Sequence, residues 1–291
     1  MTDHHVRTVL PVQAVLGEGP VWIGREQAVW FVDIKSRHIH RFDPASGTAQ
    51  RWDAPDQVGW VLPSDDGGLI AGLRTGLHRF DPADGSFTFL ARPEGDAAGN
   101  RLNDAATDSA GRIWFGTMDD AETDLTGRVY RHAGGTVSDS GLAPVCITNG
   151  PAIAGDGVTL YHTDTLGKTI WRATIDGDGR LGAATRFVTI EEGAGYPDGS
   201  VVDAEGCLWV ALWGGWGVRR YDPAGALIGT VRLPASNITK IAFGGADLRT
   251  AYATSARKGL DAEALADQPE AGNLFAFDPG VAGVPVTPVA V

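Results

Sequence analysis

The chain has 291 residues, of which 43% are hydrophobic and 21% are charged, and its formal net charge is -12. Apolar residues suffice for a large core, but no unbroken apolar run approaches the about eighteen residues that would cross a membrane. Lys and Arg are scattered, which excludes the clustered basic footprint of a nucleic-acid-binding protein. We therefore expect a soluble protein with neither nucleic acid nor a membrane as partner. Since all-β propellers often reach this size as one unit, we expect a single domain over residues 1–291.

The N-terminus and the cysteines bear on where the protein works. Met1 to Leu10 contain no apolar segment followed by small residues, as a signal peptide would, so we expect a cytoplasmic location. The two cysteines, Cys146 and Cys207, lie far apart in strand-like runs. This placement predicts buried thiols rather than a disulfide framework or a zinc cluster.

A pattern of short β-rich runs separated by tight turns recurs six times along the chain. Successive runs begin 40 to 48 residues apart, at Ala28, Gly68, Gly111, Thr159, Gly206 and Thr250. Within each run Trp, Tyr, Phe, Val and Ile alternate with polar residues, and Asp-Pro, Asp-Gly and Gly-Gly pairs mark the turns. Six such repeats predict an all-β, six-bladed β-propeller with four antiparallel strands in each blade.

The repeats also predict how the blades are arranged. A lone blade cannot bury both of its faces, so six of them must pack around a channel lined by their innermost strands. The N-terminal segment is expected to close the ring. The segment from Asp261 to Asp267, inside the sixth repeat, is the one plausible helical turn.

Polar residues occupy the same place in four of the repeats. Each precedes an aromatic residue by 11 or 12 positions: Glu18 before Trp30, Asn103 before Trp114, Asn149 before Tyr161 and Asp198 before Trp209. The second repeat has Val58 in this place, and the sixth has Thr239 or Lys240. Because equivalent positions on different innermost strands face one another, we expect the four polar side chains to converge in the channel.

Two carboxylates and two amides in a confined channel predict a bound cation. Without one, the carboxylates would repel each other in a poorly solvated space. Oxygen ligands suit hard divalent ions such as Ca²⁺, Mg²⁺, Mn²⁺ or Fe²⁺ and do not suit a closed structural zinc site. Few protein ligands leave positions open for water or substrate, as in catalytic metal sites. The alternative is that each residue only forms a turn beside Gly or Pro, and four residues in register make that weaker.

Several longer motifs carry a family resemblance over nearly the whole chain. They are LGEGPVW, NRLNDAATDSAGRIWFGTM, CITNGPAI, YHTDT, YPDGSVVDAEGCLWVALWGG and FGGADLRTAYATSA. With them the sequence resembles the sugar-lactonase family that includes gluconolactonase and regucalcin, also called senescence marker protein. Further runs, among them FVDIKSRHIHRF, HTDTLGKTI and ARKGL, are similar to bacterial xylonolactonases.

The resemblance implies roles for particular residues. Glu18, Asn149 and Asp198 match the metal ligands of the family, whereas Arg101 and Asn103 match residues that contact the sugar. Asn103 can also approach the metal. The cofactor implied is one divalent ion, with Fe²⁺ favoured and with Ca²⁺, Mn²⁺, Zn²⁺ and Mg²⁺ left open.

The activity implied is metal-dependent hydrolysis of a sugar lactone to the aldonic acid. The substrate expected is a pentonolactone such as D-xylonolactone or L-arabinolactone. Asp198 is the expected catalytic residue, and whether it acts as a general base or only positions the attacking water is open. Regucalcin-like members carry a substrate-binding glutamate after GTM, but here Ala121 stands between Asp120 and Glu122. That departure leaves the sugar specificity open.

Two other functions remain as alternatives. A propeller of this kind could bind calcium or a protein partner without catalysis, because a fold does not fix a function. A metal-dependent esterase or phosphotriesterase is the other, although Arg101 and Asn103 suit a polyol better than a bulky apolar substrate. No heptad or long exposed apolar strand points to an interface, so we expect a monomer.

Overall fold

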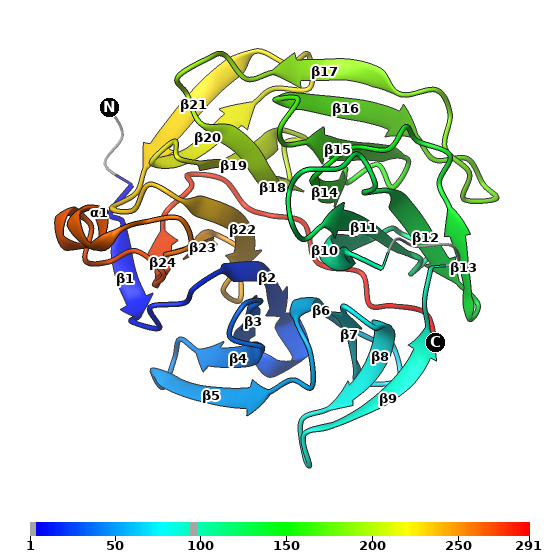
Figure 1. Ribbon diagram of the computed structural model, residues 1–291, viewed down its shortest axis with the longest axis horizontal. Helices are drawn as coiled ribbons and strands as arrows, with labels where there is room; N and C mark the ends of the chain where they lie inside the picture. Colours follow the sequence, from blue (N-terminus) through cyan, green and yellow to red (C-terminus); the bar gives the residue numbers. More distant parts are fainter. Residues whose placement is uncertain (1–3, 94–97) are drawn as a thin grey trace.

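Six four-stranded antiparallel sheets surround a central axis (Figure 1). The structure is a computed structural model that describes residues 4–93 and 98–291. The innermost strand of each sheet lies against the innermost strands of the two neighbouring sheets, in the order β2, β6, β10, β14, β18 and β22 around the ring. The six-bladed all-β propeller predicted from the repeats is confirmed.

Five blades are continuous in the chain, and each runs from its innermost to its outermost strand. Blade one comprises β2 (Gly17–Ile23), β3 (Ala28–Asp33), β4 (His38–Asp43) and β5 (Thr48–Asp53). Blade two comprises β6 (Val58–Pro63), β7 (Leu69–Leu73), β8 (Gly76–Asp81) and β9 (Ser86–Ala91). Blade three comprises β10 (Asn100–Thr107), β11 (Ile113–Asp119), β12 (Val129–Ala133) and β13 (Thr136–Asp139). Blade four comprises β14 (Thr148–Ile153), β15 (Thr159–Asp164), β16 (Thr169–Thr174) and β17 (Thr185–Thr189). Blade five comprises β18 (Tyr196–Val202), β19 (Leu208–Trp213), β20 (Gly217–Tyr221) and β21 (Leu227–Arg232).

The sixth blade joins the two ends of the chain. It contains β22 (Ile238–Gly244), β23 (Thr250–Ser255) and β24 (Leu274–Phe277), and its outermost strand is the N-terminal β1 (Arg7–Leu10). The expected closure of the ring by the N-terminal segment is therefore confirmed. Between β23 and β24 lies the short helix α1 (Ala262–Asp267), which is capped by the Asp261 side chain.

Buried tryptophans sit at matching places in blades three and five, and their indole nitrogens are satisfied. The indole Nε1 of Trp114 donates to Asp108 and that of Trp209 to Asp203, both over 2.8 Å. A buried indole needs such an acceptor, so this spacing of six residues fixes the ring against the turn before it. Cys207, close to this cluster, is a buried free thiol like Cys146, as the sequence predicted for both cysteines.

Every innermost strand contains a β-bulge near its start. One extra residue interrupts the pairing between Glu18 and Val21 in β2, and the same irregularity recurs at the equivalent place in the other five blades. A bulge bends a strand and changes the direction of a side chain. Six bulges at one level therefore present side chains to the channel that regular alternation would hide.

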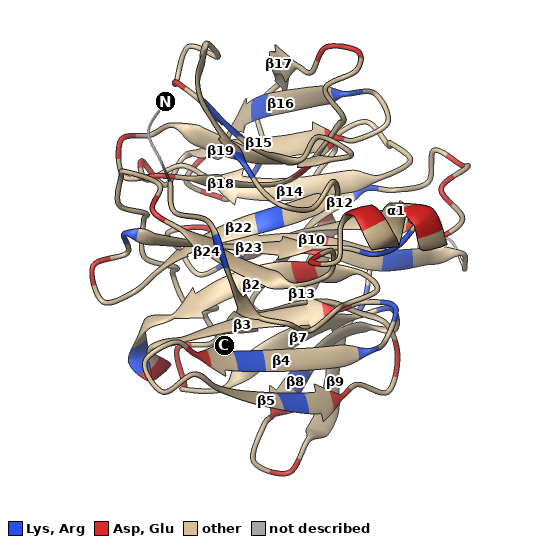
Figure 2. Cartoon of the chain, turned by 90° about the vertical axis from the view of Figure 1, so that its left-hand side faces the viewer, with Lys and Arg blue, Asp and Glu red and all other residues tan. Residues whose placement is uncertain are grey.

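The C-terminal segment crosses the end of the channel that lies beyond these bulges (Figure 1). It is bonded to blade five through Gly283 and Asp203, and to blade two through Val289 and Ser64. No helix within residues 4–93 and 98–291 is long and apolar enough to cross a membrane. Acidic and basic residues are interspersed over loops and strands on the side shown in Figure 2.

Candidate functional site

The bulges bring the four predicted polar residues together at one level of the channel. Glu18, Asn103, Asn149 and Asp198 belong to four different blades, and each is only 4–5% exposed. The convergence expected from their common register is therefore what the structure shows. Their roles toward a metal or a substrate are a separate question, taken up below.

Hydrogen bonds fix the two amides. Asn103 Nδ2 donates to Asn149 Oδ1 over 2.9 Å and to the Thr148 carbonyl over 2.7 Å. Asn149 Nδ2 in turn donates to Thr165 Oγ1 over 2.9 Å. A carbonyl oxygen has two lone pairs, so Asn149 Oδ1 keeps one for a further partner in the channel.

Arg101 lies beside the two amides and contacts Asn103. Its Nη1 donates to Asn103 Oδ1 over 2.6 Å and its Nε donates to Asp120 Oδ1 over 2.9 Å. Lys35 Nζ and Gln57 Nε2 also donate to the Asp120 carboxylate, over 2.6 and 3.1 Å. Although partial burial acts in the opposite direction, these donors hold the pKa of Asp120 at about 2. Asp120, Lys35 and Gln57 form a polar rim that the sequence analysis did not identify.

The carboxylates of the channel are held in an unfavourable state. Burial, together with the negative charge of Asp104, raises the pKa of Glu18 to about 8. Burial and the charges of Glu18 and Asp104 raise the pKa of Asp198 well above its usual range. A structure that gathers mutually repelling carboxylates away from water has a place for a positive charge.

Asp104 and Lys240 complete the charged set, and the sequence analysis missed the role of both. Asp104 is 1% exposed, and its Oδ1 accepts a hydrogen bond from Lys240 Nζ over 2.5 Å. In a regular β-strand, neighbouring side chains point to opposite faces, so Asp104 would point away from the channel if Asn103 faced the channel. The bulge between Leu102 and Ala105 removes that restriction.

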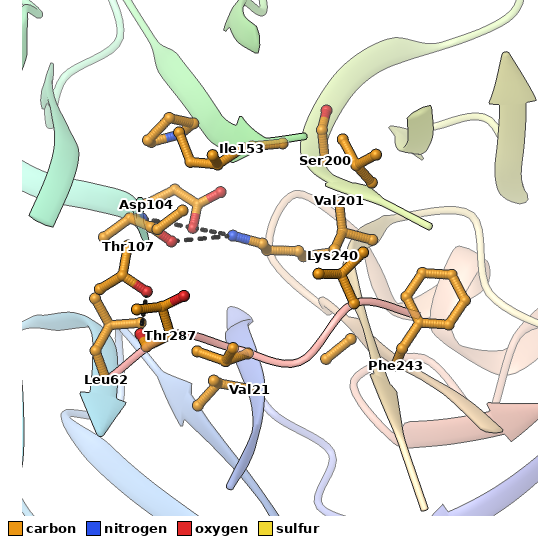
Figure 3. A pocket seen from close by; sticks show the side chains of 18 of the residues that line it. Val21, Leu62, Asp104, Thr107, Ile153, Ser200, Val201, Lys240, Phe243 and Thr287 are labelled. Carbon is orange, nitrogen blue, oxygen red and sulfur yellow. Dashed lines mark hydrogen bonds and ion pairs between the residues drawn. The ribbon is translucent and has the colours of Figure 1, made fainter. Parts of the chain in front are cut away.

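A cavity of about 180 Å³ adjoins the site on the side of the C-terminal segment (Figure 3). Its walls are residues that follow the site residues along the innermost strands, such as Val21, Ile153 and Val201. Asp104 and Lys240 face each other at its polar end, and Thr287 of the C-terminal segment lies along it. The polar rim around Arg101 therefore lies at the opposite end of the site from this cavity.

Across the rim, Glu122 forms an ion pair with Lys258. Glu122 follows β11 of blade three and Lys258 follows β23 of blade six, so the pair joins two opposite blades. Both side chains are about one-third exposed. Ala121, where the family resemblance led us to look for a substrate-binding glutamate, thus has an acidic neighbour already engaged by a lysine.

The donor set fits one divalent ion. No three His, Cys, Asp or Glu side chains within the described ranges are grouped so as to hold a metal by themselves. The third ligand would have to be an amide, and Asn149 Oδ1, at the equivalent position of blade four, has a lone pair to spare. Two carboxylates and an amide are hard oxygen donors of the kind that divalent cations bind.

Comparisons with known proteins agree with this architecture. The 6-deoxy-6-sulfogluconolactonase of Pseudomonas putida is 34% identical over 279 residues, covering 96% of both chains. The L-arabinolactonase of Azospirillum brasilense is 34% identical over 273 residues, covering 92% of this chain and 90% of its own. The crystal structure of a calcium-binding protein, regucalcin, from Agrobacterium tumefaciens superposes with a TM-score of 0.94 at 32% identity, covering 99% and 98% of the two chains. Residues 16–257 match the family described as SMP-30/Gluconolactonase/LRE-like region. The chain belongs to this family.

Proposed function

We propose that the protein catalyses metal-dependent hydrolysis of a sugar lactone, preferably a pentonolactone such as D-xylonolactone or L-arabinolactone, to the aldonic acid. That it is a lactone-hydrolysing enzyme follows from the family and from relatives named as lactonases over nearly their whole length. The observation that carries the metal dependence is the buried pair of carboxylates, Glu18 and Asp198, whose raised pKa values call for a cation.

Glu18, Asn149 and Asp198 would hold the ion. When bound, a divalent ion supplies a Lewis acid for the lactone carbonyl and lowers the cost of the negative charge that develops on its oxygen. We favour Fe²⁺, as the similarity to xylonolactonases implies, and Ca²⁺, Mn²⁺, Zn²⁺ and Mg²⁺ are the alternatives. The calcium-binding description belongs to the Agrobacterium regucalcin.

The residues of the chain would divide the remaining work. Arg101 and Asn103 bind the hydroxyl and ring oxygens of the sugar and fix its carbonyl carbon for attack. Water adds to that carbon, the ring C–O bond breaks, and the former ring oxygen leaves as a hydroxyl group. Asp198 accepts the proton of the attacking water at a carboxylate oxygen and returns it to the leaving ring oxygen, or else only orients that water while the ring oxygen takes its proton from solvent.

The preference for a pentonolactone rests on similarity and on the rim. One relative is named L-arabinolactonase and another, of Haloferax volcanii, is named a pentonolactonase. The rim residues Arg101, Asp120 and Gln57 are charged or polar, which suits a polyhydroxylated ring. The cytoplasmic location and the monomeric state stay predictions.

Lactone hydrolysis with defined metals tests the proposal. The rates on D-xylono-, L-arabino- and D-gluconolactone are measured after chelation and after adding Fe²⁺, Mn²⁺, Zn²⁺, Ca²⁺ or Mg²⁺ singly, with spontaneous opening subtracted. We expect one ion to restore turnover, fastest on a pentonolactone. A folded Asp198→Ala variant should lose activity, whereas Glu192→Gln, whose side chain is 91% exposed, should keep it.

Each result decides between the candidates. Tight metal binding without acceleration of any lactone would favour the non-catalytic calcium-binding alternative. Full activity in the folded Asp198→Ala variant would remove Asp198 from the mechanism. Turnover that survives complete chelation would contradict the metal dependence.

A further inference from the structure

Lys240 and Asp104 join opposite walls of the channel. Lys240 lies on β22 of blade six and Asp104 on β10 of blade three, three blades apart in the ring. Their side chains are 8% and 1% exposed, and Nζ lies 2.5 Å from Oδ1. Lys240 Nζ also donates to the Ala105 carbonyl over 3.4 Å. The ion pair therefore spans the channel, and Figure 3 shows the two side chains pointing toward each other.

The charges of this layer do not balance without Lys240. Glu18, Asp104 and Asp198 are three buried carboxylates whose charges act on one another. With the Lys240 ammonium their formal charge is -2 rather than -3. Arg101 also acts on Glu18 and Asp198, but its own charge is paired with Asp120 and is left out of this sum. One divalent ion neutralises the charge of -2 that remains when Lys240 is present. Without Lys240, the same ion leaves one excess negative charge.

We propose that Lys240 is a positioning residue that offsets the charge of Asp104, so that the metal is held by Glu18 and Asp198 and its affinity is set by this neighbouring ammonium. The inference rests on the metal-dependent function proposed above. It adds a residue that no family motif named here includes.

Two observations speak against a purely structural ion pair. Asp104 Oδ2 is buried and has no hydrogen-bond partner among the described residues, so the carboxylate is only half satisfied. Asp104 also lines the 180 Å³ cavity, where apolar walls would accept an apolar pair of similar volume. Replacing a buried ion pair by apolar residues is often neutral or stabilising, so stability alone does not account for this one.

Metal binding tests the proposal, because replacing Lys240 and replacing Asp104 should change the metal affinity in opposite directions. Equilibrium dialysis with Mn²⁺ on the full chain compares the wild type with Lys240→Met, Asp104→Asn and the double variant. Removing the ammonium should tighten binding roughly tenfold or more, because a like charge beside the metal is lost, and removing the carboxylate should weaken it. The Mn²⁺ affinity of the double variant should be close to that of the wild type. Lys240→Arg, which keeps the positive charge, should also bind Mn²⁺ like the wild type. Weaker binding in both single variants would overturn the proposal.

Thermal melting in chelator gives a readout that needs no metal. Lys240→Met should lower the melting temperature, and adding Asp104→Asn should recover at least half of that loss. Asp104→Asn alone should lower the melting temperature, since it leaves the buried Lys240 ammonium without its partner, whereas in the Lys240→Met background it should raise the melting temperature. Purely additive shifts would refute the charge coupling.

Arg128 provides the control. Its side chain is 43% exposed and pairs with Asp139 of the outermost strand β13, so Arg128→Met should leave Mn²⁺ affinity unchanged. If the wild type binds no metal but the melting shifts are coupled, the proposed function fails and the role of Lys240 as a counter-ion stands. If the wild type binds metal but the melting shifts are additive, the proposed function stands and the role of Lys240 as a counter-ion fails.

Discussion

Arg101 shows how one side chain orients several others in this site. It is 2% exposed, and its guanidinium donates to Asp120, to Asn103 and to the Leu102 carbonyl. Burial lowers its pKa, and the Asp120 charge opposes that effect. Because Arg101 holds Asn103 Oδ1, the amide nitrogen of Asn103 is turned toward Asn149. Asn103 thus contacts Asn149, a proposed metal ligand whose amide Thr165 also holds, so Asn149 does not depend on Arg101 alone.

Replacing Arg101 by Met should lower kcat/KM about 10- to 100-fold, mainly through KM. The reason is the loss of charged hydrogen bonds to the sugar, each contributing about 1.5–3 kcal/mol. Steady-state kinetics on a pentonolactone, together with metal analysis of the variant, provides the measurement. Arg128→Met, which removes an exposed ion pair on the same blade, should leave kcat/KM unchanged. A variant of Arg101 that no longer binds metal would contradict the assigned role.

At the scale of the strand, the bulges decide which residues reach the channel. The bulge of β10 lies in close contact with the neighbouring strand β6 at Gly59. A Cβ atom at Gly59 would lie 2.7 Å from the Asn103 carbonyl oxygen and 2.8 Å from that of Leu102. Only glycine lets β6 approach the bulge of β10 that carries Asn103 and Asp104.

Gly59→Ala should therefore destabilise the protein by about 1–3 kcal/mol, because the bulge of β10 must move to make room. It should lower lactone turnover as well, since Asn103 moves with the bulge. Chemical denaturation and kinetics measure the two effects. Gly24→Ala, where a Cβ would meet nothing within 4 Å, is the control. An active, fully stable Gly59→Ala variant would show that the bulge tolerates the shift.

The sequence predicted the blades well and the site in part. Alternation and turn pairs define strands locally, so the six repeats and the register of Glu18, Asn149 and Asp198 could be found from spacing alone. Spacing offered Thr239 or Lys240 for the equivalent position of the sixth repeat, but the contact of Lys240 with Asp104 joins residues 136 positions apart. Asp104 was hidden by the bulge, since a period of two assigns neighbouring residues to opposite faces.

The rim shows the same limit for loops. Lys35 and Gln57 belong to the connections within and after blade one, and they meet Asp120 from blade three. No periodicity links such residues, because loops carry no regular pattern and the distance is set by how the blades pack. Only the resemblance to a family drew attention to Arg101 before the structure did.

For the molecule as a whole, the buried carboxylates should give the metal-free protein an unusual pH dependence. The pKa of Glu18 is raised to about 8, so the folded state binds more protons than the unfolded state up to that pH. Stability should therefore fall as the pH rises toward 8, and Asp198 acts in the same direction. Burial lowers the pKa of His40 and of His162 to about 4. These histidines make stability rise with pH, but only between about pH 4 and the ordinary histidine pKa of about 6.5.

Between about pH 6.5 and 8 the two histidines no longer contribute, so the change in stability comes from the buried carboxylates. Chemical denaturation in chelator should show a loss of about 2–4 kcal/mol across this pH range, because Glu18 and Asp198 both keep in the folded state a proton that they have lost in the unfolded state. Adding the activating ion should flatten the profile, because the ion stabilises the ionised carboxylates. Without metal, Glu18→Gln should make the profile less steep, and the Asp198 contribution should remain. Parallel profiles with and without metal would mean that these carboxylates do not carry the dependence.

The pairing of β1 with β24 has a consequence for synthesis of the chain. β1 leaves the ribosome long before its partner β24, which begins at Leu274. At about 5–20 residues per second, β1 waits roughly ten seconds to a minute for that partner. During this time its strand edge is open to other chains and to chaperones. A nascent chain that stops before β24 can build five blades but has no means to dock its own first strand.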